Sequence, residues 1–282
     1  MHIWYINKLS LSQRTRIVAA LVEGNSIRST CRMTGAAKGT VLKLLVDLGR
    51  VCEVYQRTAL VDLKCRRIQC DEIWSFCYSK AKNVPEGMKG QEGVGDVWTW
   101  TALDSDSKLI VSYLVGTRDA GCADEFMDDV ASRLAHRVQL TTDGLRAYLD
   151  AVDGAFGLDV DFAQLVKIYG EGPNVEKRYS PARYVGSEKR RIVGNPDPEK
   201  VSTSHVERQN LTMRMSIRRF TRLTNAFSKK IENHEAAIAL HFMHYNFARV
   251  HQTLRVTPAM EAGVADHVWS IGEIVWLLGD SN

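Results

Sequence analysis

The sequence predicts an α/β protein that is preceded by a small all-helical segment. Two observations carry this prediction. Residues 10–50 repeat apolar positions at helical spacing, whereas the stretches that follow residue 67 alternate and are rich in β-forming side chains. A chain of 282 residues, 45% hydrophobic, is long enough to bury one large core beside a smaller one.

The N-terminal segment predicts three short helices. An apolar stripe that includes Ile17 and Leu21 ends at Gly24, Ser26 caps a second helix, and Gly35 turns the chain into a third helix from about 38 to 48. Such a pattern is typical of a helix-turn-helix over residues 1–55, with a plain helical bundle as the alternative. In a helix-turn-helix, the third helix enters the major groove of DNA, and the side chains expected to contact it are Lys38, Thr40 and Lys43.

The rest of the chain predicts a mixed sheet. After a linker at 56–66, RIQCDEIWSFCYSK, DVWTWTALD and KLIVSYLVG read as three strands of a meander. A helix, the strand VQLTTDG, another helix, the strand DFAQLVKIY and a late helix then follow. This order is the one that a ribonuclease H-like fold requires. We expect that catalytic domain at 67–255, with a long basic loop or insertion at about 170–201, and a tail at 256–282 that ends in a short helix.

Charge is distributed in blocks. The net charge is +4, but residues 1–70 carry +8, residues 71–164 carry −9, residues 165–232 carry +8 and residues 233–282 carry −3. Basic blocks of this size suggest a polyanionic partner, and the acidic middle suggests cation ligands or a solvated surface.

Several classes of protein are disfavoured. No stretch approaches the roughly 18 uncharged apolar residues of a membrane helix, and the N-terminus lacks the pattern of a signal peptide. We therefore expect a cytoplasmic protein with no membrane partner. The six cysteines show no zinc-binding spacing, so we interpret them as reduced, mostly buried side chains.

Three acids occupy special positions in this outline. Asp71 lies inside the first strand, Asp143 ends the strand VQLTTDG, and Glu207 starts the late helix. An acid inside a core strand costs several kcal/mol unless something compensates its charge, and a divalent metal would. Oxygen ligands suit Mg²⁺ or Mn²⁺, and two such ions about 4 Å apart activate a water or 3′-hydroxyl for attack on a phosphodiester.

The helix that carries Glu207 has a simpler alternative interpretation. Glu207 follows Ser204 at the capping-box spacing, so it could be a capping glutamate only. Glu207, Asn210, Arg214 and Arg218 would share one exposed polar stripe, from which Arg214 could bind a phosphate. We expect the remaining acids and histidines to lie outside the metal site: Glu72, Asp104, Asp106, Asp124, Glu125, Asp128, Asp129, His241, His244 and His251.

The chain resembles the DDE transposases of bacterial insertion sequences, and most specifically the insertion sequence one family. The resemblance runs from about residue 10 to 276 and is carried by IQCDEIWSF, GDVWTW, VQLTTDG, SHVERQNLTMR, FTRLTNAFSKK and MHYNFARVHQTLRVTPA. It implies a ribonuclease H-like core with Asp71, Asp143 and Glu207 as the metal-binding triad, and it matches Arg214 to the basic residue seven places after the glutamate. Asn246, Arg249 and His251 match a motif with a supporting role near the site or DNA; a buried polar helix end is the alternative.

The resemblance differs in one respect, since this chain lacks the cysteine-rich segment that family members often carry before the helix-turn-helix. We expect a transposase that binds the terminal inverted repeats of its element, cleaves there with two Mg²⁺ or Mn²⁺ ions, and joins the ends to target DNA. The alternatives are a nuclease without strand transfer and an inactive DNA-binding regulator. We further expect a homodimer or higher oligomer on double-stranded DNA, associated with the bacterial nucleoid, and DNA contacts from Arg208, Asn210, Arg218 and Arg219.

Overall fold

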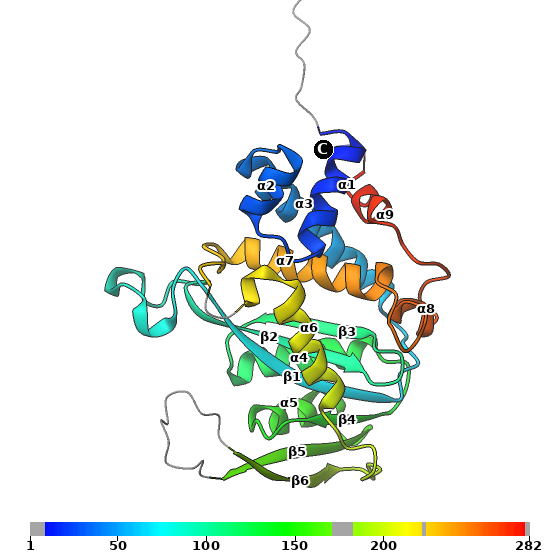
Figure 1. Cartoon of the computed structure of the whole chain (residues 1–282). Coiled ribbons are helices and arrows are strands. Elements are labelled where there is room, and N and C mark those ends of the chain that lie inside the picture. The colour runs from blue at the N-terminus through cyan, green and yellow to red at the C-terminus, as the bar shows by residue number, and fades with distance from the viewer. Residues whose placement is uncertain (1–8, 171–182, 222–223, 280–282) are drawn as a thin grey trace, which may run out of the picture. The chain divides into compact units, whose positions relative to one another are not determined.

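The computed structural model of the chain describes residues 9–170, 183–221 and 224–279 (Figure 1). The chain divides into two compact units. The first contains Met1–Val61, Trp74–Trp98 and Gln209–Asn282, and the second contains Asp62–Ile73 and Thr99–Arg208. Each unit is thus assembled from segments that are distant in the sequence.

One six-stranded sheet organises the α/β part of the fold, in the order β3-β2-β1-β4-β5-β6. β1, β4 and β5 run parallel to one another, and β6 returns antiparallel to β5. This order, with helices between β3 and β4 and between β4 and β5, is that of a ribonuclease H-like core, so the predicted fold class is confirmed. The strands are β1 (Arg67–Cys77), β2 (Gly95–Asp104), β3 (Ile110–Gly116), β4 (Val138–Thr142), β5 (Val160–Gly170) and β6 (Arg183–Val193).

Two helices of the second unit, α4 and α5, each bury an apolar stripe. α4 (Ala120–Arg133) begins where the Asp119 side chain accepts a hydrogen bond from the backbone N–H of Cys122, and it buries Phe126. α5 (Ala147–Phe156) buries Tyr148 and packs against α4. Trp100 of β2 contacts both rings, which joins the two helices to the sheet.

In the first unit, α1 (Leu11–Val22), α2 (Ile27–Thr34) and α3 (Lys38–Ala59) lie where three helices are predicted. Ser26 caps α2 by accepting from the N–H of Ser29, and Gly35 ends it in the left-handed region. α3 continues well past its predicted end because Gly49 does not stop it. A Cβ atom on Gly49 would lie 2.5 Å from Cα and Cβ of Ala236, so the glycine allows α3 to pack closely against α7 (Ile231–Met243).

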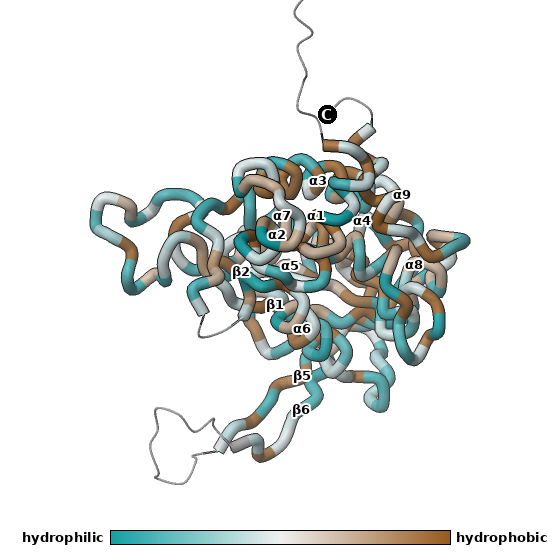
Figure 2. The backbone as a smooth tube through the Cα atoms, turned by 45° about the horizontal axis from the view of Figure 1, so that its top comes forward, coloured by the Kyte–Doolittle hydropathy of each residue, from teal (hydrophilic) through white to brown (hydrophobic). Residues whose placement is uncertain are grey.

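Two predictions about segments differ from the structure. The expected linker at 56–66 is helical up to Ala59. The expected basic loop at about 170–201 contains strand β6, while residues 171–182 lie outside the described part. Hydrophobic and hydrophilic residues alternate along β5, where it pairs with β6 (Figure 2). The remaining elements are η1 (Ala81–Asn83), η2 (Glu86–Met88), α6 (Ser204–Ser216), η3 (Arg218–Phe220), the π-helical turn η4 (His244–Ala248), α8 (Pro258–Glu261) and α9 (Ile271–Trp276).

In the part of the chain that the structure describes, no helix combines the length and the apolar character needed to cross a bilayer.

Candidate metal centre and its comparison with known proteins

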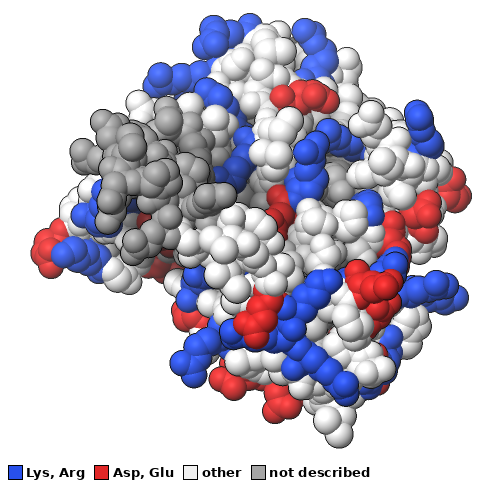
Figure 3. Space-filling view, turned by 60° about the horizontal axis from the view of Figure 1, so that its bottom comes forward, with Lys and Arg blue, Asp and Glu red and all other residues white. Residues whose placement is uncertain are grey.

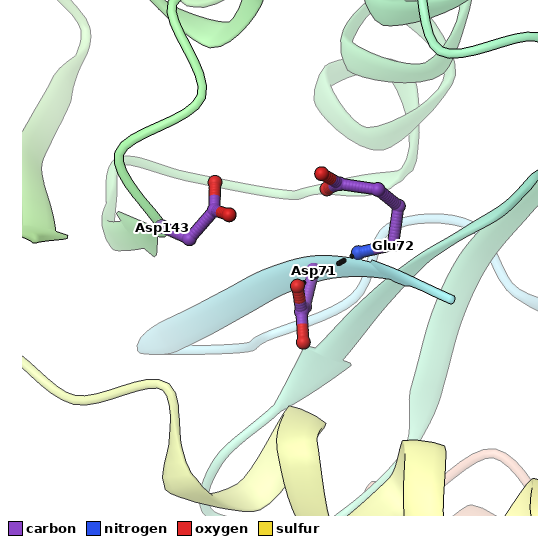
Figure 4. A group of neighbouring side chains, drawn as sticks. All are labelled: Asp71, Glu72 and Asp143. Atoms are coloured by element: carbon purple, nitrogen blue, oxygen red, sulfur yellow. Dashed lines mark hydrogen bonds between the residues drawn. The ribbon is translucent and has the colours of Figure 1, made fainter. Parts of the chain in front are cut away.

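Asp71 and Asp143 come together because β1 and β4 are neighbouring parallel strands. The register pairs Gln69 with Thr141, so two residues further along, the chain reaches Asp71 on β1 and Asp143 just after β4. Oxygen atoms of Asp71, Glu72 and Asp143 lie within 4.8 Å of one another (Figure 4). The Asp143 carboxylate is held by the N–H of Leu145, which donates to its Oδ1 at 2.9 Å. The sequence thus brings two of its three predicted acids to one place.

The alternation of side chains along β1 gives its acids different surroundings. Gln69, buried in β1, accepts hydrogen bonds from the N–H groups of His205 and Val206 at 2.9 and 3.2 Å, which attaches the first turn of α6 to the strand. Asp71 is two residues further and shares that face. Figure 4 shows its carboxylate on the opposite side of β1 from that of Glu72.

Glu72 belongs to the acidic cluster, which differs from its predicted place outside the site. Its side chain is only 1% exposed. The Arg118 Nη2 lies 2.6 Å from Glu72 Oε1, and the Tyr148 hydroxyl donates to Oε2 at 3.0 Å. Arg118 Nη2 also lies 3.8 Å from Asp143 Oδ2. Glu72 therefore forms an ion pair with Arg118, and the same guanidinium lies near Asp143.

Glu207 is held by two partners near the start of α6. Lys167 Nζ of β5 lies 2.5 Å from Glu207 Oε2, and the Thr203 hydroxyl donates to Oε1. Glu207 is not among the acids whose oxygens lie within 4.8 Å of Asp71 and Asp143. It is nevertheless close enough for its charge to raise the pKa of Asp71. Glu207 therefore interacts with Lys167 and with the charge of Asp71 in addition to the start of its own helix.

The electrostatics favour a cation at this place. Burial raises the pKa of Asp71 to about 7, and the negative charges of Glu72, Asp143 and Glu207 contribute to the rise. Burial and the charge of Asp143 likewise raise the pKa of Glu72, against the effect of Arg118. For Lys167, burial lowers the pKa, but the hydrogen bond and the charge of Glu207 outweigh it, so the pKa is raised. The cluster carries an excess of negative charge that protons or a metal ion would relieve.

The chemistry of the donors fits a hard divalent ion. All the predicted ligands are carboxylates, one inside β1 and one just after the neighbouring parallel strand β4, and carboxylate oxygens are the preferred ligands of Mg²⁺ and Mn²⁺. The sequence does not predict that Gln69, Arg118 and Lys167 hold the acids or the helix that carries Glu207 in place. Nothing in their local sequence indicates these roles, because each partner comes from another element of the fold.

The predicted DNA-contacting residues have different surroundings. Lys38, Thr40, Lys43, Arg208 and Arg218 are exposed. Lys43 forms an ion pair with Asp47, and Arg218 lies in η3 rather than α6, so the expected stripe ends before it. Asn210, expected on that stripe, is only 9% exposed. Arg219 is partly buried and donates through Nε to the Ser228 hydroxyl at 2.7 Å, and Arg214 is half-buried in the last turn of α6.

The acids expected outside the site have other partners or face solvent. Asp104 Oδ2 accepts from the N–H and hydroxyl of Ser107, Asp106 pairs with Arg67, and Asp129 pairs with Arg133. The exposed face of α4 carries Asp124, Glu125 and Asp128.

Histidines and the motif of the tail pack mainly in the first unit. His241 is buried, and burial lowers its pKa to about 3, while burial also lowers the pKa of His244. Asn246 is fully buried, which favours the buried polar helix end over a DNA contact. Arg249 is exposed, and His251 Nδ1 lies 3.0 Å from the Thr253 hydroxyl oxygen.

Part of the chain matches the sequence model of a known protein family. Residues 185–248 match the sequence model of a family described as IS1 transposase. The chain resembles the IS1 transposases. The IS1 transposase match contains Glu207, Arg214 and Asn246, whereas Asp71 and Asp143 lie outside it. This match supports the interpretation of the chain as a transposase. No curated protein sequence matches the chain.

Solved structures that resemble the chain are also transposases, at low identity. The piggyBac transposase synaptic complex with hairpin DNA is 10% identical, with a TM-score of 0.43 over 99% of this chain and 72% of that chain. A pre-cleavage Mos1 transpososome is 12% identical, with a TM-score of 0.24 over 57% and 61% of the two chains. The Mos1 mariner paired end complex with Mn is 12% identical, with a TM-score of 0.21 over 54% and 59%.

Proposed function

We propose that the chain is a DNA transposase that binds the terminal inverted repeats of its own element, cleaves DNA there with Mg²⁺ or Mn²⁺, and joins the ends to a target. The observation that carries the proposal is the pair of Asp71, inside β1, and Asp143, just after the adjacent parallel strand β4, with the charge of Glu207 acting on Asp71. The IS1 transposase match over residues 185–248 supports the same class.

Asp71 and Asp143 would hold the metal between them, and Glu207 would complete its ligands. The metal would supply an activated water or 3′-hydroxyl and stabilise the leaving oxygen of the phosphodiester. The chain itself holds these ligands in place. Arg118 keeps Asp143 beside the buried Glu72, and Gln69 fixes the first turn of α6, which carries Glu207.

Asp71 must also lose its proton before it can bind a metal, because its pKa of about 7 keeps a fraction protonated near neutrality. The ammonium of Lys167 holds Glu207 and limits its repulsion of Asp71. Because Asp71 must be ionised to bind a metal, metal binding would weaken as the pH falls below about 7.

DNA would be bound by basic side chains outside the metal cluster. Lys38, Thr40 and Lys43 lie on the exposed start of α3, as a helix that enters the major groove requires. Arg208 and Arg218 would contact phosphates, with Arg214 nearby in sequence. Figure 3 shows Lys and Arg side chains gathered in groups on one face, with acidic side chains between them. Binding through phosphates would weaken steeply with salt, and concerted joining of two ends calls for at least a dimer.

The test is cleavage and joining of labelled DNA that carries the ends of the element, in Mg²⁺, Mn²⁺ or EDTA. Asp71→Asn and Glu207→Gln should abolish both reactions while they leave DNA binding intact, and Glu125→Gln, a change on the exposed face of α4, should leave both unchanged. Cutting without joined products would favour a nuclease. Binding without any cutting by the parent chain would favour a regulator.

A further inference from the structure

The first unit contains an aromatic pocket that the metal cluster does not use. It has a volume of about 340 Å³ and is lined on one side by Trp74, Phe76 and Phe227. The rings of Trp74 and Phe76 are 5.7 Å apart between centroids, and those of Phe76 and Phe227 are 5.0 Å apart. All three side chains are only half-buried, although large aromatic residues usually fill cores. Part of each ring is therefore accessible to a ligand.

Cations lie against the same pocket. Lys80 Nζ stands 5.6 Å from the Trp74 ring centroid and 5.9 Å from that of Phe76. Arg219 lines the pocket as well, and burial lowers its pKa to about 10. Among the residues that the structure describes, its only hydrogen-bond partner is the Ser228 hydroxyl, and no carboxylate forms an ion pair with it. A partly buried guanidinium without an acidic partner is suited to an anion.

These features together match the chemistry of a nucleotide. A base offers a flat π-face that stacks on aromatic side chains, and its phosphate offers charge to lysine and arginine. The polar side chains of Thr221, Thr224 and Asn225 at the pocket can donate to or accept from the edge of a base. We infer that this pocket binds one unstacked nucleotide of a DNA strand, with the base against Trp74, Phe76 and Phe227 and the phosphate near Lys80 and Arg219.

The inference rests on the proposed function, because it takes DNA to be the ligand. It adds that the chain holds a nucleotide that has left the base stack, in a pocket that is not lined by the three acids. Base pairing and stacking oppose such a conformation in a duplex, so the pocket should prefer single-stranded or frayed DNA to blunt duplex.

The first experiment measures the affinity of the full chain for a fluorescent single-stranded oligothymidylate. Trp74→Ala and Phe227→Ala should each weaken binding by about fivefold or more, the lower end of base–aromatic stacking. Trp74→Phe keeps an aromatic face and should keep most of the affinity. Trp276→Ala is the matched control, since Trp276 is an exposed tryptophan of α9, and it should bind like the parent. Equal affinity of all four variants and the parent would overturn the inference.

The second experiment needs no substitution, so it tests the pocket even if the substituted variants fail to fold. An oligothymidylate with one 5-iodouracil is photo-crosslinked to the parent chain, and the modified peptides are mapped. Adducts on residues 74–80 or 219–227 support the pocket, and adducts confined to other segments refute it. If the parent cuts element ends but the pocket variants bind and cut equally well, the pocket fails and the proposed function stands. If adducts map to the pocket but the parent never cuts, the proposed function fails and the pocket stands.

Discussion

Gln69 offers the sharpest test of how the fold positions Glu207. Its side-chain oxygen accepts from two N–H groups at the start of α6, one of which, that of Val206, is buried. In Gln69→Ala the Val206 N–H loses its partner, which costs about 1–3 kcal/mol, and the more exposed N–H of His205 adds about 1 kcal/mol or less. We expect the free energy of unfolding to fall by about 1–4 kcal/mol, a large share of the stability of a typical domain.

The assay has two readouts. Urea unfolding gives the free energy, and titration with Mn²⁺, followed by paramagnetic relaxation of water protons, gives the affinity of the metal site. Since α6 carries Glu207, the Gln69→Ala variant should also bind Mn²⁺ several-fold more weakly.

Gln139 provides the matched control for this experiment. Its amide also makes two hydrogen bonds to backbone, with Asp197, but at an exposed position where water can replace them. Gln139→Ala should therefore lose about 1 kcal/mol or less and should bind Mn²⁺ like the parent. Equal losses of stability in the two variants, or an unchanged Mn²⁺ affinity in Gln69→Ala, would refute the argument that Gln69 positions Glu207.

Three further predictions follow from the same contacts. Burial raises the pKa of Asp71 to about 7, so the ionised form of Asp71 opposes folding of the metal-free chain. The free energy of unfolding should therefore decline as the pH rises from about 4 to 7. The affinity for Mn²⁺, measured by calorimetry at several pH values, should fall by up to about tenfold for each pH unit below 7, because a proton then competes with the metal. Lys167→Met removes the ammonium that competes with a metal for Glu207, so Mn²⁺ should bind about fivefold more tightly in the same titration; weaker binding would mean that Lys167 mainly orients Glu207. Gly49→Val overlaps Ala236 and should lower the free energy of unfolding by about 1–3 kcal/mol or more in urea, whereas Gly39→Ala, with open space around it in the same helix, should not destabilise the chain.

The acids of the centre were predictable from local sequence, but their supports were not. Asp71 stands out because it is an acid inside a predicted core strand, and Asp143 because it ends a predicted strand before a glycine. Arg118 follows β3 and meets Glu72 only through the tertiary fold, so no periodicity indicates the pair. The alternation of side chains predicts Glu72 on the other face of β1, and its side chain does point there, yet Asp143 lies close enough to bring all three acids together.

Segments with both faces exposed were harder to predict than buried ones. β6 is an edge strand whose described side chains are mostly exposed, so it lacks the alternation of apolar residues that signals a strand, and its charge favours a loop. The end of α3 was predicted too early, because a glycine such as Gly49 commonly marks the end of a helix. Only the approach of Ala236 explains why a glycine stands in the middle of that helix.

The packing of α3 on α7 also sets an order of events during synthesis. Gln56 of α3 donates to the carbonyl oxygen of Ala239 at 3.2 Å, a bond between residues 183 positions apart. The ribosome therefore releases α3 long before it makes the helix against which α3 is buried. Until that point the part of α3 that α7 covers lacks this partner, and a nascent or prematurely terminated chain would present it to chaperones and proteases.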